Sequence, residues 1–271
     1  MARSGKAAKH LLRRLSARGD AEVLRGELAL VGLPGVVYAP ASGRGLPAVA
    51  FGHGWIQPAR RYAGLLRHLA SWGFVVLAPD TQRGPFGSAQ ALAADLSTAL
   101  DVATGVRLGT GRITVDGDRL ALAGHGVGAG AAVVAAATDR RVRAAALLAP
   151  SQTMPPASVA AESVSCPGLI LIAERDRVAP AAGHAEPIAL SWAGPIRVRT
   201  IRKASHLGFF EHHSWTDLLV AGGPERATRR IALAFTTAFL LKELTGSTDY
   251  DSLLDDELRA APLWPLPEPA V

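Results

Sequence analysis

The chain has 271 residues, 49% of them hydrophobic, which is enough to bury one large core in a single α/β domain. Its one cysteine, Cys166, excludes an intrachain disulfide and a zinc site built from thiolates, and no run of about 18 apolar residues predicts a membrane span. The formal net charge of +6 comes from residues 1–18, which hold six basic residues and no acid, so the rest of the chain is neutral and shows no basic cluster typical of a nucleic-acid partner.

Residues 1–20 form the first predicted segment, a basic N-terminal arm. Leu11, Leu12 and Leu15 recur there at helical spacing among lysines and arginines. This pattern is compatible with an interfacial helix that is attracted to an anionic membrane surface through residues 1–18, but it favours the alternative, a tail that is mobile or packed on the protein surface. The arm lacks the apolar segment of a secretory signal, so we expect a cytoplasmic protein, with peripheral membrane contact left open.

The body of the chain, residues 21–248, alternates apolar runs with helical patterns, which is typical of parallel strands joined by crossover helices. Strands are predicted at 22–31, 35–40, 46–51, 74–78, 119–123, 144–148, 168–173 and 196–201. Helices are predicted at 60–72, 88–106, 129–137 and 226–244. We therefore expect one α/β domain, with a mostly parallel central sheet and helices on both faces. The acidic and then proline-rich tail, residues 249–271, has no periodicity and is predicted to be irregular or wrapped on the surface.

A glycine-rich turn, Gly124-His125-Gly126-Val127-Gly128, joins a predicted strand directly to a predicted helix. A strand, a Gly-x-nucleophile-x-Gly turn and a helix form the nucleophile elbow of a catalytic triad whose acid and histidine follow in that order. Asp176 follows a later apolar strand, and His206 follows the last strand. The pattern predicts an acid slot at Asp176 and a base slot at His206, with Gly126 in the nucleophile slot.

Over residues 46–245 these motifs resemble the dienelactone-hydrolase and cutinase-like polyester-hydrolase branch of the α/β-hydrolases. The resemblance rests on Gly54-Trp55, residues 69–76, Asp80-Thr81, the elbow, and the segments around Asp176 and His206. It implies an α/β-hydrolase fold, carboxylic-ester-hydrolase ancestry, and an oxyanion hole made by the backbone N–H groups of Trp55 and Val127. By position, the resemblance also places His53, His125 and Ser151 at the ligand pocket. A packing role is the alternative for His125.

Two residues depart from that family pattern. Gly126 replaces serine and has no side chain to attack a carbonyl carbon, a loss that typically costs about 10⁴ to 10⁶ in rate. Glycine also tolerates the elbow backbone, which costs an ordinary residue on the order of 1–3 kcal/mol. Ser151 stands where polyester hydrolases often place an aromatic residue that clamps the substrate. Covalent ester chemistry is therefore excluded, and polymer binding is disfavoured.

Other nucleophiles and metal ligands are disfavoured by their positions. Ser205 adjoins His206, and such a neighbour usually points away from the imidazole, whereas Cys166 precedes a strand as a small buried hydrophobe would. The run 211–213, Glu-His-His, favours a solvated helix start, because helical metal ligands prefer i, i+4 spacing. We expect no metal and no cofactor.

Three functional hypotheses remain open. The first is a pseudoenzyme that binds a small acyl, ester or lipid-like ligand, or a protein partner. The second is an enzyme that uses the His206–Asp176 dyad without a covalent intermediate, for direct hydrolysis or proton transfer. The third is an ordinary carboxylic-ester hydrolase in which an engineered serine-to-glycine change produced Gly126, and this is ranked last because alanine is the commoner inactivating choice.

Overall fold

The computed structural model describes residues 2–212 and 223–265 and, for side chains, residues from Ala7 onward. Its centre is an eight-stranded sheet in the order β1-β2-β4-β3-β5-β6-β7-β8. β2 pairs with β1 on one side and with β4 on the other as antiparallel strands, and all other pairs are parallel. The strands are β1 (Val23–Glu27), β2 (Gly35–Pro40), β3 (Gly43–Gly52), β4 (Val75–Pro79), β5 (Ile113–His125), β6 (Val142–Leu148), β7 (Gly168–Ala173) and β8 (Ile196–Ile201).

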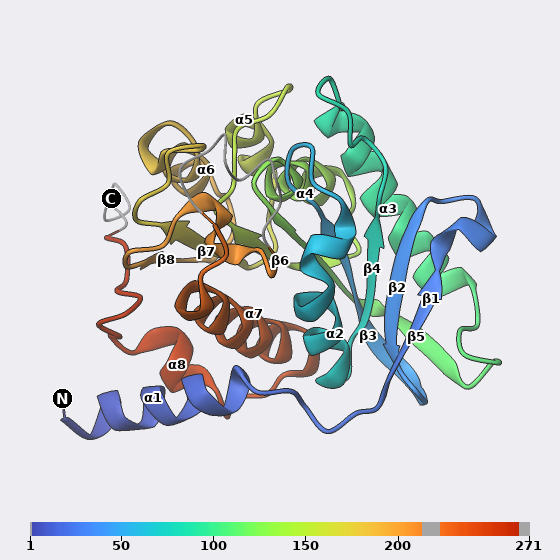
Figure 1. The fold of residues 1–271 in the computed structure, drawn as a ribbon, viewed down its shortest axis with the longest axis horizontal. Helices are drawn as coiled ribbons and strands as arrows, with labels where there is room; N and C mark the ends of the chain where they lie inside the picture. Colours follow the sequence, from blue (N-terminus) through green and yellow to red (C-terminus); the bar gives the residue numbers. More distant parts are fainter. Residues whose placement is uncertain (1, 213–222, 266–271) are drawn as a thin grey trace.

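Helices cover both faces of this sheet, as Figure 1 shows. Alternate strand residues point into two separate cores, one packed against α1, α2, α7 and α8 and the other against α3 to α6. The predicted α/β class, with a mostly parallel sheet, is thereby confirmed. The helices are α1 (Ala2–Leu15), α2 (Ala63–Ser71), α3 (Ala89–Gly105), α4 (Val127–Thr138), α5 (Ala157–Ala161), α6 (Ala185–Leu190), α7 (Arg226–Thr245) and α8 (Asp251–Asp255), with 3-10 helices η1 (Leu28–Val31), η2 (Ala59–Tyr62), η3 (Ala181–Gly183) and η4 (His206–Phe209).

Two predicted strand boundaries were wrong. Residues 28–31 form η1 instead of extending the first strand, because Gly32, at φ +85°, ends the turn in a left-handed conformation and leads the chain back into β2. β5 begins at Ile113, six residues before the prediction, because its polar first half pairs with the start of β3 through Gly43 and Leu46.

Both ends of the described chain pack onto the same core. α1 lies against α7 and α8 (Figure 1), with Ala8 and Leu15 fully buried and Leu11 and Leu12 partly buried. The apolar face that could enter a lipid surface is therefore occupied by the body, and the predicted membrane contact would require α1 to undock. No helix among residues 2–212 and 223–265 is long and apolar enough to span a bilayer.

The C-terminal segment is held by one buried guanidinium group. Arg199, on β8, is 0% exposed and donates hydrogen bonds to the backbone oxygens of Leu254 (2.8 Å), Asp256 (2.7 Å) and Ala261 (2.8 Å). Residues 260–264 run antiparallel beside β8 and hydrogen-bond to it. Part of the predicted irregular tail thus covers the edge of the sheet.

Three glycines allow α4 to touch the sheet directly. A Cβ on Gly128, in the first turn of α4, would lie 2.3 Å from the carbonyl carbon and oxygen of Gly52 on β3. A Cβ on Gly124, at the end of β5, would lie 2.4 Å from the Gly128 oxygen. Backbone meets backbone at these positions, so the turn between β5 and α4 is fixed in place.

We expect Gly128→Ala to lower the free energy of unfolding by about 3 kcal/mol or more, because backbone atoms cannot yield to the added methyl group as a flexible side chain can. Urea denaturation followed by circular dichroism measures the change. Gly105→Ala is the matched control, since a Cβ there meets nothing within 4 Å. It should leave stability unchanged or raise it by up to about 1 kcal/mol. Equal stabilities of the two variants would contradict the packing argument.

Candidate active site

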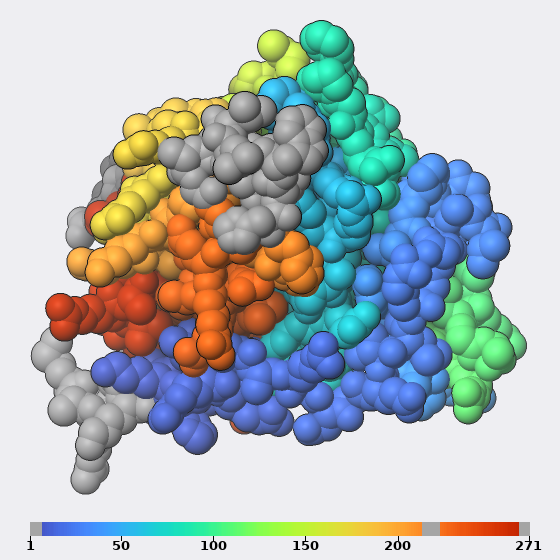
Figure 2. Space-filling model, viewed as in Figure 1, coloured from blue at the N-terminus to red at the C-terminus, as the bar shows by residue number. Residues whose placement is uncertain are grey.

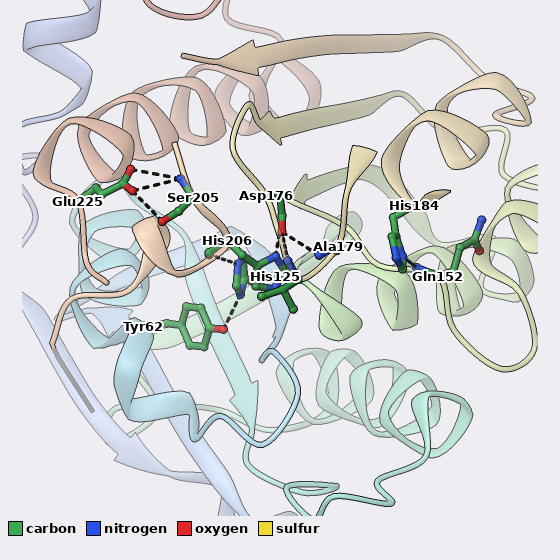
Figure 3. A network of polar contacts seen from close by, with 10 residues as sticks. Tyr62, His125, Gln152, Asp176, Ala179, His184, Ser205, His206 and Glu225 are labelled. Atoms are coloured by element: carbon green, nitrogen blue, oxygen red, sulfur yellow. Dashed lines mark hydrogen bonds and ion pairs between the residues drawn. The ribbon is translucent and has the colours of Figure 1, made fainter. Parts of the chain in front are cut away.

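The structure brings the predicted acid and base into direct contact (Figure 3). Asp176 lies in the loop after β7, and His206 begins η4 after β8. The distance from His206 Nδ1 to Asp176 Oδ2 is 2.7 Å, and the two side chains are 9% and 3% exposed. The other carboxylate oxygen accepts the backbone N–H groups of Val178 (2.9 Å) and Ala179 (2.7 Å). A carboxylate held in this way fixes the imidazole with its proton on Nδ1, which leaves Nε2 as the basic nitrogen.

Gly126 occupies the apex of the turn directly beside that nitrogen. Its φ of +56° and ψ of −123° form a backbone conformation that L-residues rarely adopt. A Cβ built there would lie 3.0 Å from His206 Nε2 and 3.8 Å from Ser151 Oγ. The glycine therefore stands where the elbow pattern requires a nucleophile, and the imidazole lies close to the space that a side chain would need.

The two residues predicted to form the oxyanion hole line one small cavity. Val127 is the first residue of α4, so its N–H has no acceptor within the helix. Neither this N–H nor that of Trp55 donates a hydrogen bond to any residue that the structure describes. His53 and Gly54 also line the cavity, whose volume of about 10 Å³ matches one water molecule. The cavity that Trp55 and Val127 border is thus too small for a ligand larger than a water molecule.

The three residues predicted to line a ligand pocket have different surroundings. His53 borders the small cavity, although it is buried, with Nε2 2.7 Å from the Thr81 oxygen. Ser151 is buried, and its N–H donates to the Gly126 oxygen. The pocket prediction was wrong for His125, which is 0% exposed and packs against the rings of His206 and Phe209. It serves as a core residue because the side chain at this elbow position points away from the turn into the core.

A buried chain of hydrogen bonds, which the sequence did not indicate, runs from the backbone of Gly54, after β3, to the backbone of His206, and Figure 3 shows its part from Tyr62 through His125 to His206. The His206 oxygen can only accept, so His125 Nε2 donates to it (3.0 Å) and His125 Nδ1 is an acceptor. Tyr62 Oη then donates to His125 Nδ1 (2.8 Å) and accepts the N–H of Gly54 (3.0 Å). No motif marks Tyr62, because its role depends on the placement of η2 beside β5.

The alternative nucleophiles point elsewhere or are held as neutral groups. Ser205 donates its hydroxyl to Glu225 (2.7 Å), which also accepts the Ser205 N–H, as Figure 3 shows. Burial raises the pKa of Cys166 to about 11, so its thiol stays protonated at neutral pH. Glu225 is a second residue that the sequence did not indicate, and it fixes the loop that carries His206.

Within residues 2–212 and 223–265, no group of three histidine, cysteine, aspartate or glutamate side chains could hold a metal ion. Glu211 instead accepts the backbone N–H of Leu65 at 2.9 Å. The third residue of the predicted Glu-His-His run, His213, lies outside the described residues.

Exposed apolar side chains come from three loops that follow strands at this end of the sheet. Trp55 follows β3, Phe86 follows β4 and Met154 follows β6, with exposed fractions of 56%, 98% and 83%. Trp55 Nε1 donates to the Pro85 oxygen at 3.0 Å, which ties two of these loops together. We call Trp55, Phe86 and Met154 the apolar rim.

Burial lowers the pKa of His125 well below its usual range, so this side chain is neutral in the folded protein. The unfolded chain takes up a proton there near pH 6.5, whereas the folded chain does not. Stability should therefore fall below about pH 6.5, with His125 contributing a slope of about 1.4 kcal/mol per pH unit. We expect His125→Gln to flatten the pH dependence of urea unfolding between pH 7.5 and 5 by about that amount. An unchanged slope would mean that His125 is charged in the fold.

One family profile and several curated proteins match the chain. The profile of the PET hydrolase-like family matches residues 22–213. Cutinase of Thermobifida fusca (strain YX) is 33% identical over 153 residues, which are 56% of this chain and 49% of that protein. Cutinase est1 of Thermobifida alba is 30% identical over 153 residues, or 56% and 50% of the two chains.

The third match is bis(hydroxyethyl) terephthalate hydrolase of Streptomyces coelicolor (strain ATCC BAA-471 / A3(2) / M145), which is 34% identical over 166 residues, or 59% of this chain and 50% of that protein. The chain thus spans about half the length of the curated relatives it matches. The cutinase-like resemblance found in the sequence is confirmed. Because the family profile extends from the start of the sheet past the dyad, over more than half of the chain, the protein belongs to the PET hydrolase-like family of α/β-hydrolases.

Proposed function

We propose that this chain is a non-acylating member of its family, a pseudoenzyme that binds a small acyl, ester or lipid-like ligand beside the His206–Asp176 dyad. The observation that carries the proposal is Gly126, whose position next to His206 Nε2 offers no atom to attack a carbonyl carbon. Without that attack an acyl-enzyme cannot form, whatever the oxyanion donors contribute.

The surroundings of the dyad support loss of the nucleophile over its replacement. Ser205 Oγ is engaged with Glu225. Cys166 precedes β7, at the amino end of the parallel strands, whereas Gly126 follows the carboxyl end of β5. The hydroxyl nearest to the vacant side-chain position is that of Ser151, at 3.8 Å from the ideal Cβ. A test of the proposal must therefore ask whether Ser151 acts as the nucleophile.

The apolar rim is the surface on which we place the ligand. The cavity at Trp55 and Val127 holds about one water, so an acyl group must lie outside it, against the exposed side chains of Trp55, Phe86 and Met154. A carbonyl oxygen of such a ligand could accept hydrogen bonds from the Trp55 and Val127 N–H groups. The class of ligand follows from this combination of an apolar surface and two donors.

Labelling with a fluorophosphonate, which reacts with activated serines, tests the central claim. We expect the unmodified chain to remain unlabelled and Gly126→Ser to become labelled, as measured by intact-protein mass spectrometry. The new side chain would sit at φ +56° and 3.0 Å from His206 Nε2. Gly126→Ser should therefore also lower the free energy of unfolding by about 1–3 kcal/mol.

Two matched variants locate any label. Gly126→Ser/His206→Ala should stay unlabelled, because the serine then has no base. Ser151→Ala in the unmodified background tests the nearest hydroxyl. If the unmodified chain is labelled and Ser151→Ala removes the label, the nucleophile has moved to Ser151 and the proposal is wrong.

The second candidate function is non-covalent hydrolysis by the dyad. It is favoured by His206 Nε2, which makes no hydrogen bond to any described residue and borders the space between Gly126 and Ser151 Oγ. A water molecule there could transfer a proton to Nε2 while its oxygen attacks an ester, with Asp176 stabilising the imidazolium. General-base catalysis of this kind supplies roughly 10²–10⁴-fold acceleration.

On this second hypothesis the unmodified chain hydrolyses p-nitrophenyl acetate slowly, about 10²–10⁴-fold above the uncatalysed rate, without a burst of p-nitrophenol. His206→Ala should reduce the rate to background, whereas His10→Ala, at an exposed position on α1, should not change it. The release of p-nitrophenol, followed at 405 nm, measures the hydrolysis rate of each variant. Equal rates for the two variants would rule out the dyad as the base and leave the binding function.

A further inference from the structure

A second cavity, separate from the dyad, lies between α2 and α7 and has a volume of about 320 Å³. Its lining residues come from segments that are distant in the sequence: the chain just after α1, the first two turns of α2, the end of β6, residues 209–212 and the first two turns of α7. Figure 2 views the molecule on this side, with α2 in cyan, α7 in orange and the segment after α1 in blue. The volume lies in the range of small-molecule sites. We call it the α2–α7 cavity.

Its walls carry an unusual excess of arginine. Arg226, Arg229, Arg230 and Leu233 line it from α7 at i, i+3, i+4 and i+7, which places them along one face of the helix. Arg18 adds a fourth guanidinium from the segment after α1. Like charges at these spacings repel one another, so an anion between them would relieve a local cost.

These guanidinium groups are poorly compensated by the protein itself. Glu211 is the only acid among the described lining residues, and its carboxylate accepts the Leu65 N–H. Arg18, Arg226 and Arg230 form no ion pair with a described residue. Arg229 donates from Nη1 to the Glu211 backbone oxygen (3.4 Å), while its Nε is buried without a hydrogen-bond partner among the residues described. A buried donor of this kind is costly unless a ligand satisfies it.

The rest of the wall is apolar. Leu65, Leu148, Phe209 and Leu233 line the cavity beside the arginines. His68, which also lines it, is neutral at physiological pH because burial lowers its pKa to about 4, and its Nε2 lies 3.1 Å from Thr237 Oγ1. A small inorganic anion would leave this apolar surface unused, whereas a neutral lipid would leave the arginines unpaired.

We propose that the α2–α7 cavity binds an amphipathic organic monoanion, namely an aliphatic carboxylate. Its head group lies among Arg226, Arg229 and Arg230, and its chain lies on Leu65 and Phe209. Guanidinium groups hold carboxylates in bidentate geometry, and each methylene buried on the apolar wall adds to the affinity. This site is independent of Gly126 and of the function proposed for the dyad.

Isothermal titration of the full chain at constant ionic strength, with sodium octanoate below its micelle concentration, tests the proposal. We expect octanoate to bind about tenfold or more tightly than butyrate, because four buried methylenes are lost in butyrate. Octan-1-ol, with the chain but no charge, and inorganic phosphate, with charge but no chain, should each bind at least about tenfold more weakly than octanoate.

Paired variants locate the site. Arg226→Gln/Arg230→Gln removes two exposed cavity arginines and should weaken octanoate binding about tenfold or more. Arg44→Gln/Arg112→Gln removes the same charge from exposed positions outside the cavity and should leave affinity within about twofold. Leu233→Gln keeps the wall's bulk and should reduce the preference for octanoate over butyrate. Circular dichroism verifies that each variant is folded.

Three results would overturn the proposal. One is the absence of octanoate binding. Another is equal weakening of octanoate binding by both arginine double variants, which would mean that the attraction comes only from the overall charge of the protein. Phosphate binding as tight as octanoate binding would mean a simple anion site without use of the apolar wall. None of these results bears on labelling of residue 126, so the two proposals fail separately.

Discussion

The contact of α4 with β3 and β5 is the constraint on which the site depends. Gly52, Gly124 and Gly128 let backbone touch backbone, with no room for a Cβ at Gly124 or Gly128. This contact fixes the turn at Gly126 and the first free N–H of α4, at Val127. It also brings the turn to the carboxyl edge of the sheet, where the loops after β7 and β8 deliver Asp176 and His206. The elbow is thus held by main-chain packing, and no side chain at position 126 is needed to form it.

The rest of the site is stabilised by interactions that bypass residue 126. Asp176 is held by two backbone donors, and His206 by Asp176. Hydrogen bonds from Gly54 through Tyr62 and His125 tie the loop after β3 to the His206 backbone. None of these contacts involves a side chain at the nucleophile position. The contact between Asp176 and His206, and the N–H groups of Trp55 and Val127 that have no acceptor among the described residues, therefore do not depend on a side chain at position 126.

The electrostatics of the molecule are organised locally, although residues 19–271 are formally neutral overall. Arg199 is buried, and its guanidinium group donates hydrogen bonds to three backbone carbonyl oxygens of the C-terminal segment. These bonds hold that segment against the edge of β8. Arg197 on the same strand pairs with Glu243 and Asp255. The arginines at the start of α7 have no such partners among the described residues, and they face a cavity. The formal neutrality of residues 19–271 thus conceals a cavity wall on which, among the described residues, arginine outnumbers acid.

The sequence by itself determined the α/β class, most strands and the long helices, because buried strands and amphipathic helices leave periodic patterns that packing must satisfy. It also predicted that Gly126, Asp176 and His206 lie close together, since their motifs are tied to strand ends. Short helices such as α5 and α8 escaped prediction, because five residues carry too little periodicity. Only the tertiary structure decided that α1 docks on α7, that Tyr62 and Glu225 support the dyad, and that His125 is a core residue. These contacts join residues far apart in the chain, and their geometry exists only once the sheet has brought its loops together.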